Sequence, residues 1–226
     1  VSNTDADSVG GKGASLGEMH SNLSDAGVRI PNGFNVTTAA YENFVATIVP
    51  KSTWDNVAEP DGTAEVRQEA LHCNTLADAL KVVIGGVDAS DHLDMHGRAA
   101  LARALVLQTP VPENIRSAII EGYSTLCDEY GQGTDVAVRS SATTEDSEEA
   151  SFAGQYESFL NISGERSVIQ HWRRCVASLF TERAIGYQLE KGMDPLDSSL
   201  SVVVMKMVRS DLACSGVMFT IDPDSG

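Results

Sequence analysis

The stretch 112–139 does most to restrict the fold, because it sets a long amphipathic helix directly before a buried strand. After Pro112, apolar side chains recur at helical spacing until Gly131, at Ile115, Ala118, Ile119, Tyr123, Leu126, Cys127 and Tyr130. The sequence "DVAVR" follows as a strand. Because helices and strands intermix, with antiparallel-looking strands late in the chain, we expect an α+β (α/β mixed) fold rather than a bundle or a barrel.

Elements before this stretch are mostly predicted helices. The sequence "VGGKGASLGEM" begins as a glycine-rich loop and becomes a helix, and a short strand near 34–36 precedes a helix capped by Thr37 or Thr38. Residues 50–98 predict two or three helices and contain no chemical motif.

Elements after Arg139 follow a polar loop. We expect a strand at "YESFLNI", a long helix from about 165 to 190 with Trp172 and Phe180 in the core, and a hairpin-like pair, "SLSVVVMKMV" and "CSGVMFTIDP". The prediction is one domain, 1–226, with a glycine-loop and helical subdomain (1–109) and a strand-rich part (110–226).

Composition places the chain among globular proteins. Its 226 residues are 42% hydrophobic, which is enough for a core. No run approaches the roughly 20 apolar residues of a membrane span, and the polar, acidic N-terminus lacks the regions of a secretory signal, so we expect a cytoplasmic protein that binds no membrane. The four cysteines lie in apolar patterns without CxxC spacing, so we expect neither a disulfide nor zinc.

Charge is the most unusual bulk property. The chain has 32 acidic against 16 basic residues, a formal net charge of -16, which argues against nucleic-acid binding. The surplus is spread along the chain, as expected of a surface adapted to a salty cytoplasm, where mobile ions screen self-repulsion. The alternative is an acidic face for a basic partner.

The "GGKG" segment invites a phosphate-binding interpretation, since glycines expose backbone N–H groups and Lys12 adds a mobile positive charge. It is not a Walker A loop, because Ala6 and Gly13 stand where that motif needs Gly and Ser or Thr. It is not a Rossmann fingerprint either, because Leu16 replaces the last glycine. A plain loop with an exposed lysine is the alternative.

Arg139 is the more informative residue. It stands at the end of "VAV" among small hydroxyl residues, where a strand delivers a rigid, charged fork to the mouth of a site. The flexible sequence after it is suited to folding over a phosphate chain and excluding water. The alternative pairs Arg139 with Glu145 or Asp146. The five histidines show no convincing metal-ligand spacing, so we predict no metal ligand in this chain.

Several motifs, in order, resemble the N-terminal nucleotide-binding domain of phosphoenolpyruvate synthases (pyruvate, water dikinases). They are "VGGKGASLGEM", "IPNGFNVTTAAY", "TPVPENIRSAIIEGY", "VAVRSSATTEDSEEASFAGQYESFLNI" and "VRSDLACSGVMFTIDPDSG", which cover nearly the whole chain. Pyruvate phosphate dikinases share the first and last. Rifamycin phosphotransferases carry similar "RSSA" and "SFAGQ" motifs and are the nearest alternative family.

The resemblance implies an ATP-grasp fold that holds ATP between two lobes. Lys12 and Arg139 are then expected to contact the triphosphate as its charge redistributes. The other implied nucleotide contacts are Gly154 through backbone N–H groups, Ser158 nearby, and an adenine-side hinge of Met205, Met207 and Val208. Met205 departs from the family, which has glutamine there, so the amide's hydrogen bonds to adenine are lost.

The same resemblance implies that the chain is a fragment. The family continues beyond residue 226 with a "GLGE" segment and the acidic residues that hold Mg²⁺, and with separate phosphohistidine and pyruvate-binding domains as partners. We therefore expect ATP and Mg²⁺ as cofactors and no turnover by this chain alone. The alternatives are the ATP-binding domain of an antibiotic phosphotransferase and a non-catalytic acidic interaction module.

Overall fold

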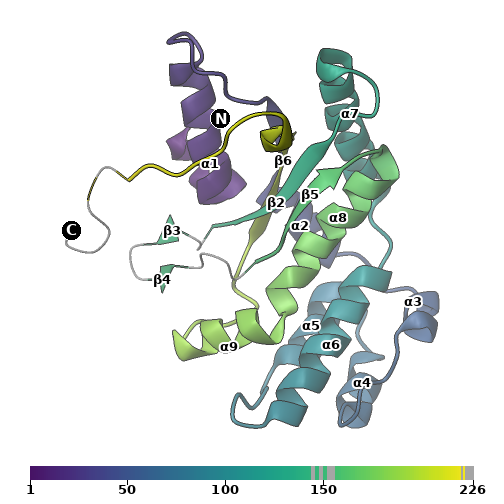
Figure 1. The fold of residues 1–226 in the computed structure, drawn as a ribbon. Coiled ribbons are helices and arrows are strands. Elements are labelled where there is room, and N and C mark those ends of the chain that lie inside the picture. Colours follow the sequence, from purple (N-terminus) through teal and green to yellow (C-terminus); the bar gives the residue numbers. More distant parts are fainter. Residues whose placement is uncertain (144–145, 148–149, 152–155, 220, 222–226) are drawn as a thin grey trace.

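The computed structural model describes residues 1–143, 146–147, 150–151, 156–219 and 221, which form a mixed α+β fold (Figure 1). The α-helices are α1 (Ala6–Leu23), α2 (Thr38–Val45), α3 (Lys51–Asn56), α4 (Ala64–Ala70), α5 (Leu76–Ile84), α6 (His92–Gln108), α7 (Glu113–Tyr130), α8 (Glu165–Ala177) and α9 (Glu182–Glu190). The strands are β1 (Gly33–Val36), β2 (Val136–Ala142), β3 (Asp146–Ser147), β4 (Ala150–Ser151), β5 (Ser158–Ile162) and β6 (Leu200–Lys206). Short 3-10 helices are η1 (Asn3–Asp5), η2 (Ser178–Phe180) and η3 (Ser210–Leu212). The predicted α+β class is confirmed.

The main sheet has four antiparallel strands in the order β1-β6-β2-β5. β6 lies between β1 and β2, so that Val204 pairs with Phe34 on one side and Val138 on the other. β1 and β5 are therefore the two edges of this sheet. β3 and β4 form a separate two-stranded pair.

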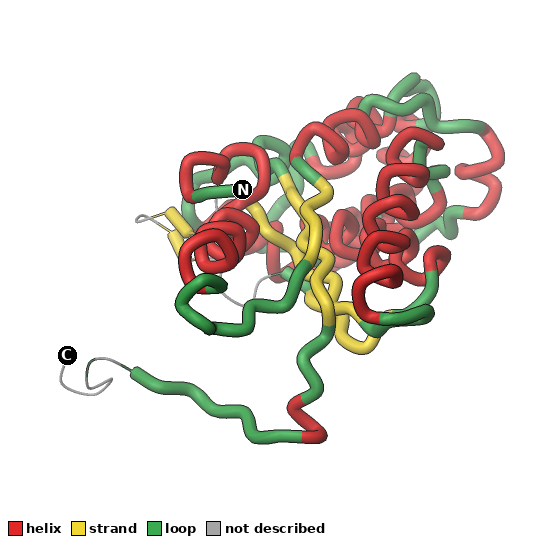
Figure 2. The backbone as a smooth tube through the Cα atoms, turned by 90° about the horizontal axis from the view of Figure 1, so that it is seen from above, coloured by secondary structure: helices red, strands yellow, loops and turns green. Residues whose placement is uncertain are grey.

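Helices cover the two sides of the sheet unequally. α1 packs against β2 and β6, whereas α8 packs against β2 and β5. In Figure 1, α1 lies on one side of the sheet and α8 lies on the other, and Figure 2 shows most of the helices gathered on one side of the strands. α6 joins the helices α3–α5 to this second layer through its contacts with α5 and α8.

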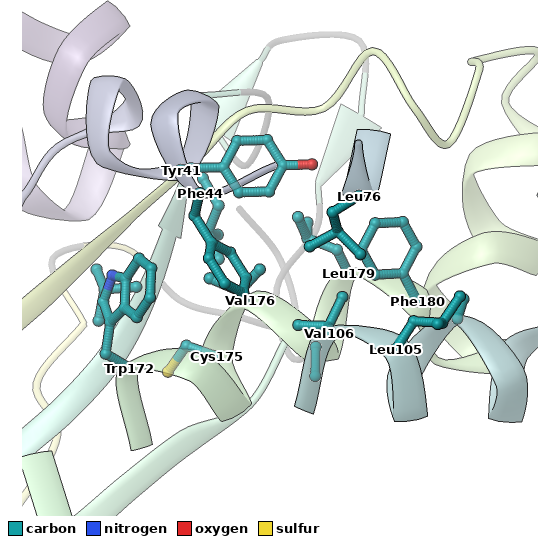
Figure 3. Packing of buried hydrophobic residues seen from close by; sticks show 14 of the residues in the cluster. Tyr41, Phe44, Leu76, Leu105, Val106, Trp172, Cys175, Val176, Leu179 and Phe180 are labelled. Carbon is teal, nitrogen blue, oxygen red and sulfur yellow. The ribbon is translucent and has the colours of Figure 1, made fainter. Parts of the chain in front are cut away.

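The core lies between the sheet and the layer that contains α8. Val136 and Val138 of β2 are fully buried there. The rings of Phe44 and Trp172 meet edge to face with centroids 5.4 Å apart, and Phe180 is buried in the same cluster (Figure 3). The predicted core positions of Trp172 and Phe180 are confirmed.

The glycine-rich segment differs from its expected loop. α1 begins at Ala6 and runs through "VGGKG", and the interruption is confined to Gly10, whose φ of 69° and ψ of 168° are not helical. This backbone conformation is open essentially to glycine alone. The segment is therefore a kinked helix.

The single long helix predicted for about 165–190 is wrong, because it divides into α8, η2 and α9. Thr181 adopts an extended conformation, with φ -75° and ψ 149°, which ends the helical path. Its side chain then accepts a hydrogen bond from the Ala184 amide and caps the start of α9.

The predicted hairpin near the C-terminus is also wrong for the described residues, since β6 forms but 213–219 contain no strand. β6 already has β1 and β2 as neighbours, so neither of its edges is open to a following strand. Residues in this last segment are exposed, among them Phe219.

The cysteines follow the expected packing in part. Cys127 and Cys175 are buried, and burial raises the pKa of the Cys175 thiol, which therefore stays neutral beneath β2. Cys214 lies exposed, contrary to the expectation that all four lie in apolar surroundings.

Candidate functional site

Alternation along β2 sorts its side chains onto the two faces of the sheet. Val136 and Val138 point into the core, so Ala137, Arg139 and Ser141 lie on the opposite face, where the Ser141 hydroxyl bonds to α1. We call this side the α1 face.

A pocket of about 360 Å³ opens on the α1 face and collects most of the predicted site residues. Its lining residues are Ala137, Arg139, Ser158, Leu160, Met205, Lys206, Met207 and Val208. Strand pairing explains how they meet: Arg139 stands opposite Ser158 of β5, and Ala137 stands opposite Met205 of β6. β2 therefore aligns a cationic residue with the expected hinge segment.

The pocket combines two cationic side chains, Arg139 and Lys206, with apolar walls. Arg139 is half-buried, and within the described part of the chain no hydrogen bond or ion pair joins its guanidinium to another side chain. Leu160 and Val208 are 54% and 60% exposed, which is high for large apolar side chains. The Lys206 ammonium donates to the Asp135 carbonyl at 3.4 Å. Such a surface suits a ligand with one anionic end and one flat apolar end.

Lys12 does not line this pocket. It is half-buried on α1, between the non-helical Gly10 and Gly13, whose amide is fixed to Ser141 on β2. Since Ser141 is two residues from Arg139 on the same face, the Lys12 segment is held close to the strand that carries Arg139. The expected convergence of the two side chains on a phosphate remains a prediction.

Gly154 lies outside the described residues, as does Glu145, one of the two carboxylates proposed as an alternative partner of Arg139. For the other, Asp146, the structure describes only the backbone position in β3. The predicted backbone contact of Gly154 and the alternative ion pairs therefore stay predictions.

Sequence reasoning missed Ala137, Leu160 and Lys206 as pocket residues. For Ala137 and Leu160 the signal was present, since side chains two positions apart on a strand share a face. Ala137 precedes Arg139 by two positions, and Leu160 follows Ser158 by two.

Met205 occupies a position shared by two cavities. Besides the pocket beside Arg139, it lines a smaller one of about 210 Å³ between α1 and β1. Gly33 pairs with Met205, and a Cβ at Gly33 would lie 2.9 Å from the Met205 Cβ, so the strands approach closely here. Asn35, also missed, lines the smaller cavity, and its Oδ1 is buried without a hydrogen-bond partner among the described atoms.

The chain belongs to the family of the pyruvate phosphate dikinase AMP/ATP-binding domain, which it matches over residues 6–226. Its relatives include the phosphoenolpyruvate synthase of Synechocystis sp., 44% identical over 231 residues, which cover 100% of this chain and 25% of that protein. The phosphoenolpyruvate synthase of Escherichia coli is 40% identical over 222 residues (98% and 25%), and a probable phosphoenolpyruvate synthase of Methanocaldococcus jannaschii is 39% identical over 226 residues (100% and 16%). The family indicated by the motifs is confirmed, and the chain spans a quarter or less of the length of these relatives.

A membrane-spanning helix and a cluster of metal-ligating side chains are both absent from the described residues. In the part of the chain that the structure describes, no helix is both long and apolar enough to cross a membrane. Among the same residues, no three or more His, Cys, Asp or Glu side chains gather in a way that could hold a metal ion.

Proposed function

We propose that this chain is the ATP-binding part of a phosphoenolpyruvate synthase-like dikinase, which converts ATP, pyruvate and water to AMP, phosphoenolpyruvate and phosphate. Family membership supports nucleotide binding. The observation that carries the location of the site is the pocket shared by Arg139, Ser158 and residues 205–208. Phosphate transfer through a histidine and its delivery to pyruvate belong, in this proposal, to other domains of a longer, cytoplasmic protein.

The proposed binding mode follows from the two ends of the pocket. The planar guanidinium of Arg139 suits phosphate oxygens, and the Ser158 hydroxyl opposite it adds a donor. Met205 and Met207 supply polarizable side chains that pack against an aromatic base. Lys12 and the Gly154 backbone complete the phosphate contacts in the ATP-grasp arrangement that the family resemblance implies.

Mg²⁺ accompanies ATP in phosphoryl transfer, where it bridges and neutralises phosphate oxygens. Among the described residues, no group of three or more His, Cys, Asp or Glu side chains could hold a metal ion. Mg²⁺ usually takes one or two carboxylates and completes its coordination with water and substrate phosphates. The role proposed for these residues is accordingly the binding and orientation of the nucleotide.

A ¹H–¹⁵N and methyl NMR titration of the chain with ATP tests this function. We expect saturable shifts at Arg139, Ser158 and the methyl groups of Met205 and Met207, since these residues line one pocket. Adenosine should bind more weakly than ATP, because it lacks the phosphates that Arg139 recognises. The absence of saturable shifts with millimolar ATP, or shifts confined to another surface, would refute the proposal.

We further propose that the acidic surplus adapts the surface to high salt. No Asp, Glu, Lys or Arg is among the buried residues that the structure describes, so the charge lies at the surface. On α7, for example, four acidic side chains are exposed: Glu113, Glu121, Asp128 and Glu129.

Raising KCl from about 0.1 M to 1 M, which shortens the screening length from roughly 10 Å to 3 Å, should therefore raise the melting temperature. The gain should shrink in an E121Q/D128N double variant, which removes two exposed charges from α7. A melting temperature that stays level or falls with KCl in the unmodified chain would rule out the adaptation.

A further inference from the structure

One side chain of β2 forms hydrogen bonds with two backbone groups of α1. The Ser141 hydroxyl donates to the Val9 carbonyl at 2.8 Å and accepts from the Gly13 amide at 3.1 Å, and both hydrogen bonds are buried. Val9 and Gly13 are an i, i+4 pair, whose carbonyl and amide bond directly to each other in a regular helix. At the kink, the serine hydroxyl takes the place of that bond, one of the known causes of a helix kink.

Gly10 makes this insertion possible. A Cβ at this position would lie 2.2 Å from the Ser141 carbonyl oxygen and 2.3 Å from its Oγ, so no other residue allows the same approach. Its φ of 69° also lies in the region that favours glycine. The kink and the serine contact are therefore one feature.

Other polar atoms in this interface do not share that role. Ser201 stands opposite Ser141 on β6, yet its Oγ is buried without a hydrogen-bond partner among the described atoms, as is Oδ1 of Asn35 beside Gly13. Among these three side chains, Ser141 is the one that fixes α1 to the sheet through hydrogen bonds at both its donor and its acceptor.

We propose that Ser141 is a positioning residue for the nucleotide site: by bridging the kink of α1, it holds the Lys12 turn in register with the strand that carries Arg139. Lys12 lies between the two ends of the bridged segment, and Arg139 lies two residues before Ser141 on the same face. The inference rests on the proposed function and adds a residue that is not among those lining the pocket.

The test is a double-mutant cycle on ATP affinity, measured by NMR titration of the unmodified chain, Ser141→Ala, Lys12→Ala and the double variant. Loss of one bridging hydroxyl should weaken ATP binding about fivefold. In the Lys12→Ala background the same change should have almost no effect, because Ser141 acts through Lys12. A purely structural role would weaken binding equally in both backgrounds.

Ser140→Ala is the matched control. Ser140 is the neighbouring buried serine, but its hydroxyl points to the other face and donates to the Glu157 carbonyl at 3.2 Å. The Ser140→Ala variant removes a hydroxyl from β2, as Ser141→Ala does, and should leave ATP affinity unchanged. Equal ATP affinity of Ser141→Ala and the unmodified chain would overturn the positioning role and leave the proposed function intact. No ATP binding by the unmodified chain would overturn both.

Hydrogen exchange of the Gly13 amide in the unmodified chain gives a second measurement, which needs no variant to fold. If nucleotide binding and the bridged kink are coupled, saturating ATP must slow exchange at Gly13, while amides within α6, remote from the pocket, keep their rates. An unchanged Gly13 rate at saturation would contradict the inference.

Discussion

An Arg139→Ala variant should bind ATP at least tenfold more weakly than the unmodified chain. A hydrogen bond between a charged donor and a phosphate contributes about 1.5–3 kcal/mol, and a change of 1.4 kcal/mol is a factor of ten in affinity. Within the described part of the chain, no side chain forms a hydrogen bond or ion pair with Arg139, so among these residues the substitution breaks no contact of this kind. NMR titration of both chains with ATP measures the change.

Two comparisons separate this loss from a general effect of charge. Arg139→Lys keeps the charge but not the planar guanidinium, so its affinity for ATP should lie between that of the unmodified chain and that of Arg139→Ala. Arg116→Ala removes an exposed arginine on α7 that pairs with Glu113 at 3.2 Å. Arg116 is not among the residues lining the pocket, so this variant should bind ATP normally. An Arg139→Ala chain with unchanged ATP affinity would remove this residue from the site.

A Trp172→Ala variant should lose about 3–5 kcal/mol of unfolding free energy, the range for removing a large aromatic side chain from a core. Trp172 is 1% exposed on α8 and packs edge to face with Phe44, so the deletion leaves a cavity and removes an aromatic pair (Figure 3). Urea unfolding at a fixed KCl concentration measures the difference. That loss is a large part of the 5–15 kcal/mol typical of a folded domain.

Phe219→Ala is the matched control for this measurement. Phe219 is also aromatic, but it is 66% exposed in the segment after η3. Its removal should change the unfolding free energy by less than about 0.5 kcal/mol. A Trp172→Ala chain that loses under 1 kcal/mol would show that the α8 layer is not the principal core.

Helical periodicity made α7 predictable from sequence, because its buried side chains recur on one side of the helix. β2 and β5 were predictable as short strand-like segments rather than by alternation, since β2 is buried on both faces and β5 buries only Ile162. β6 was also predictable as a strand. Its neighbours were not, because pairing such as Gly33 with Met205 joins segments far apart in the chain, and no local pattern specifies it. The failed hairpin has this origin: adjacent apolar segments suggested a pair, but β1 and β2 already occupy both sides of β6.

For the candidate site, most of the lining residues were predictable from the sequence, but the contact between α1 and β2 was not. Motif resemblance supplied Arg139, Ser158 and the hinge residues Met205, Met207 and Val208, which the structure brings into one pocket. Strand alternation would have added Leu160. The contact of Ser141 with the kink at Gly10 could not be predicted. It depends on where a helix and a strand from opposite halves of the chain meet, and it replaces a bond that helical periodicity assumes to be present.

The central place of β6 has a consequence for the order in which the chain acquires its structure. In the described sheet β1 pairs only with β6, and β2 also needs β6 to complete its pairing. A growing polypeptide on the ribosome therefore holds β1 without a partner until residues 200–206 have emerged. Pairing between segments far apart in the chain is slow, so the helices are expected to form first. The sheet is then completed last, when β6 inserts between β1 and β2, which were synthesised earlier.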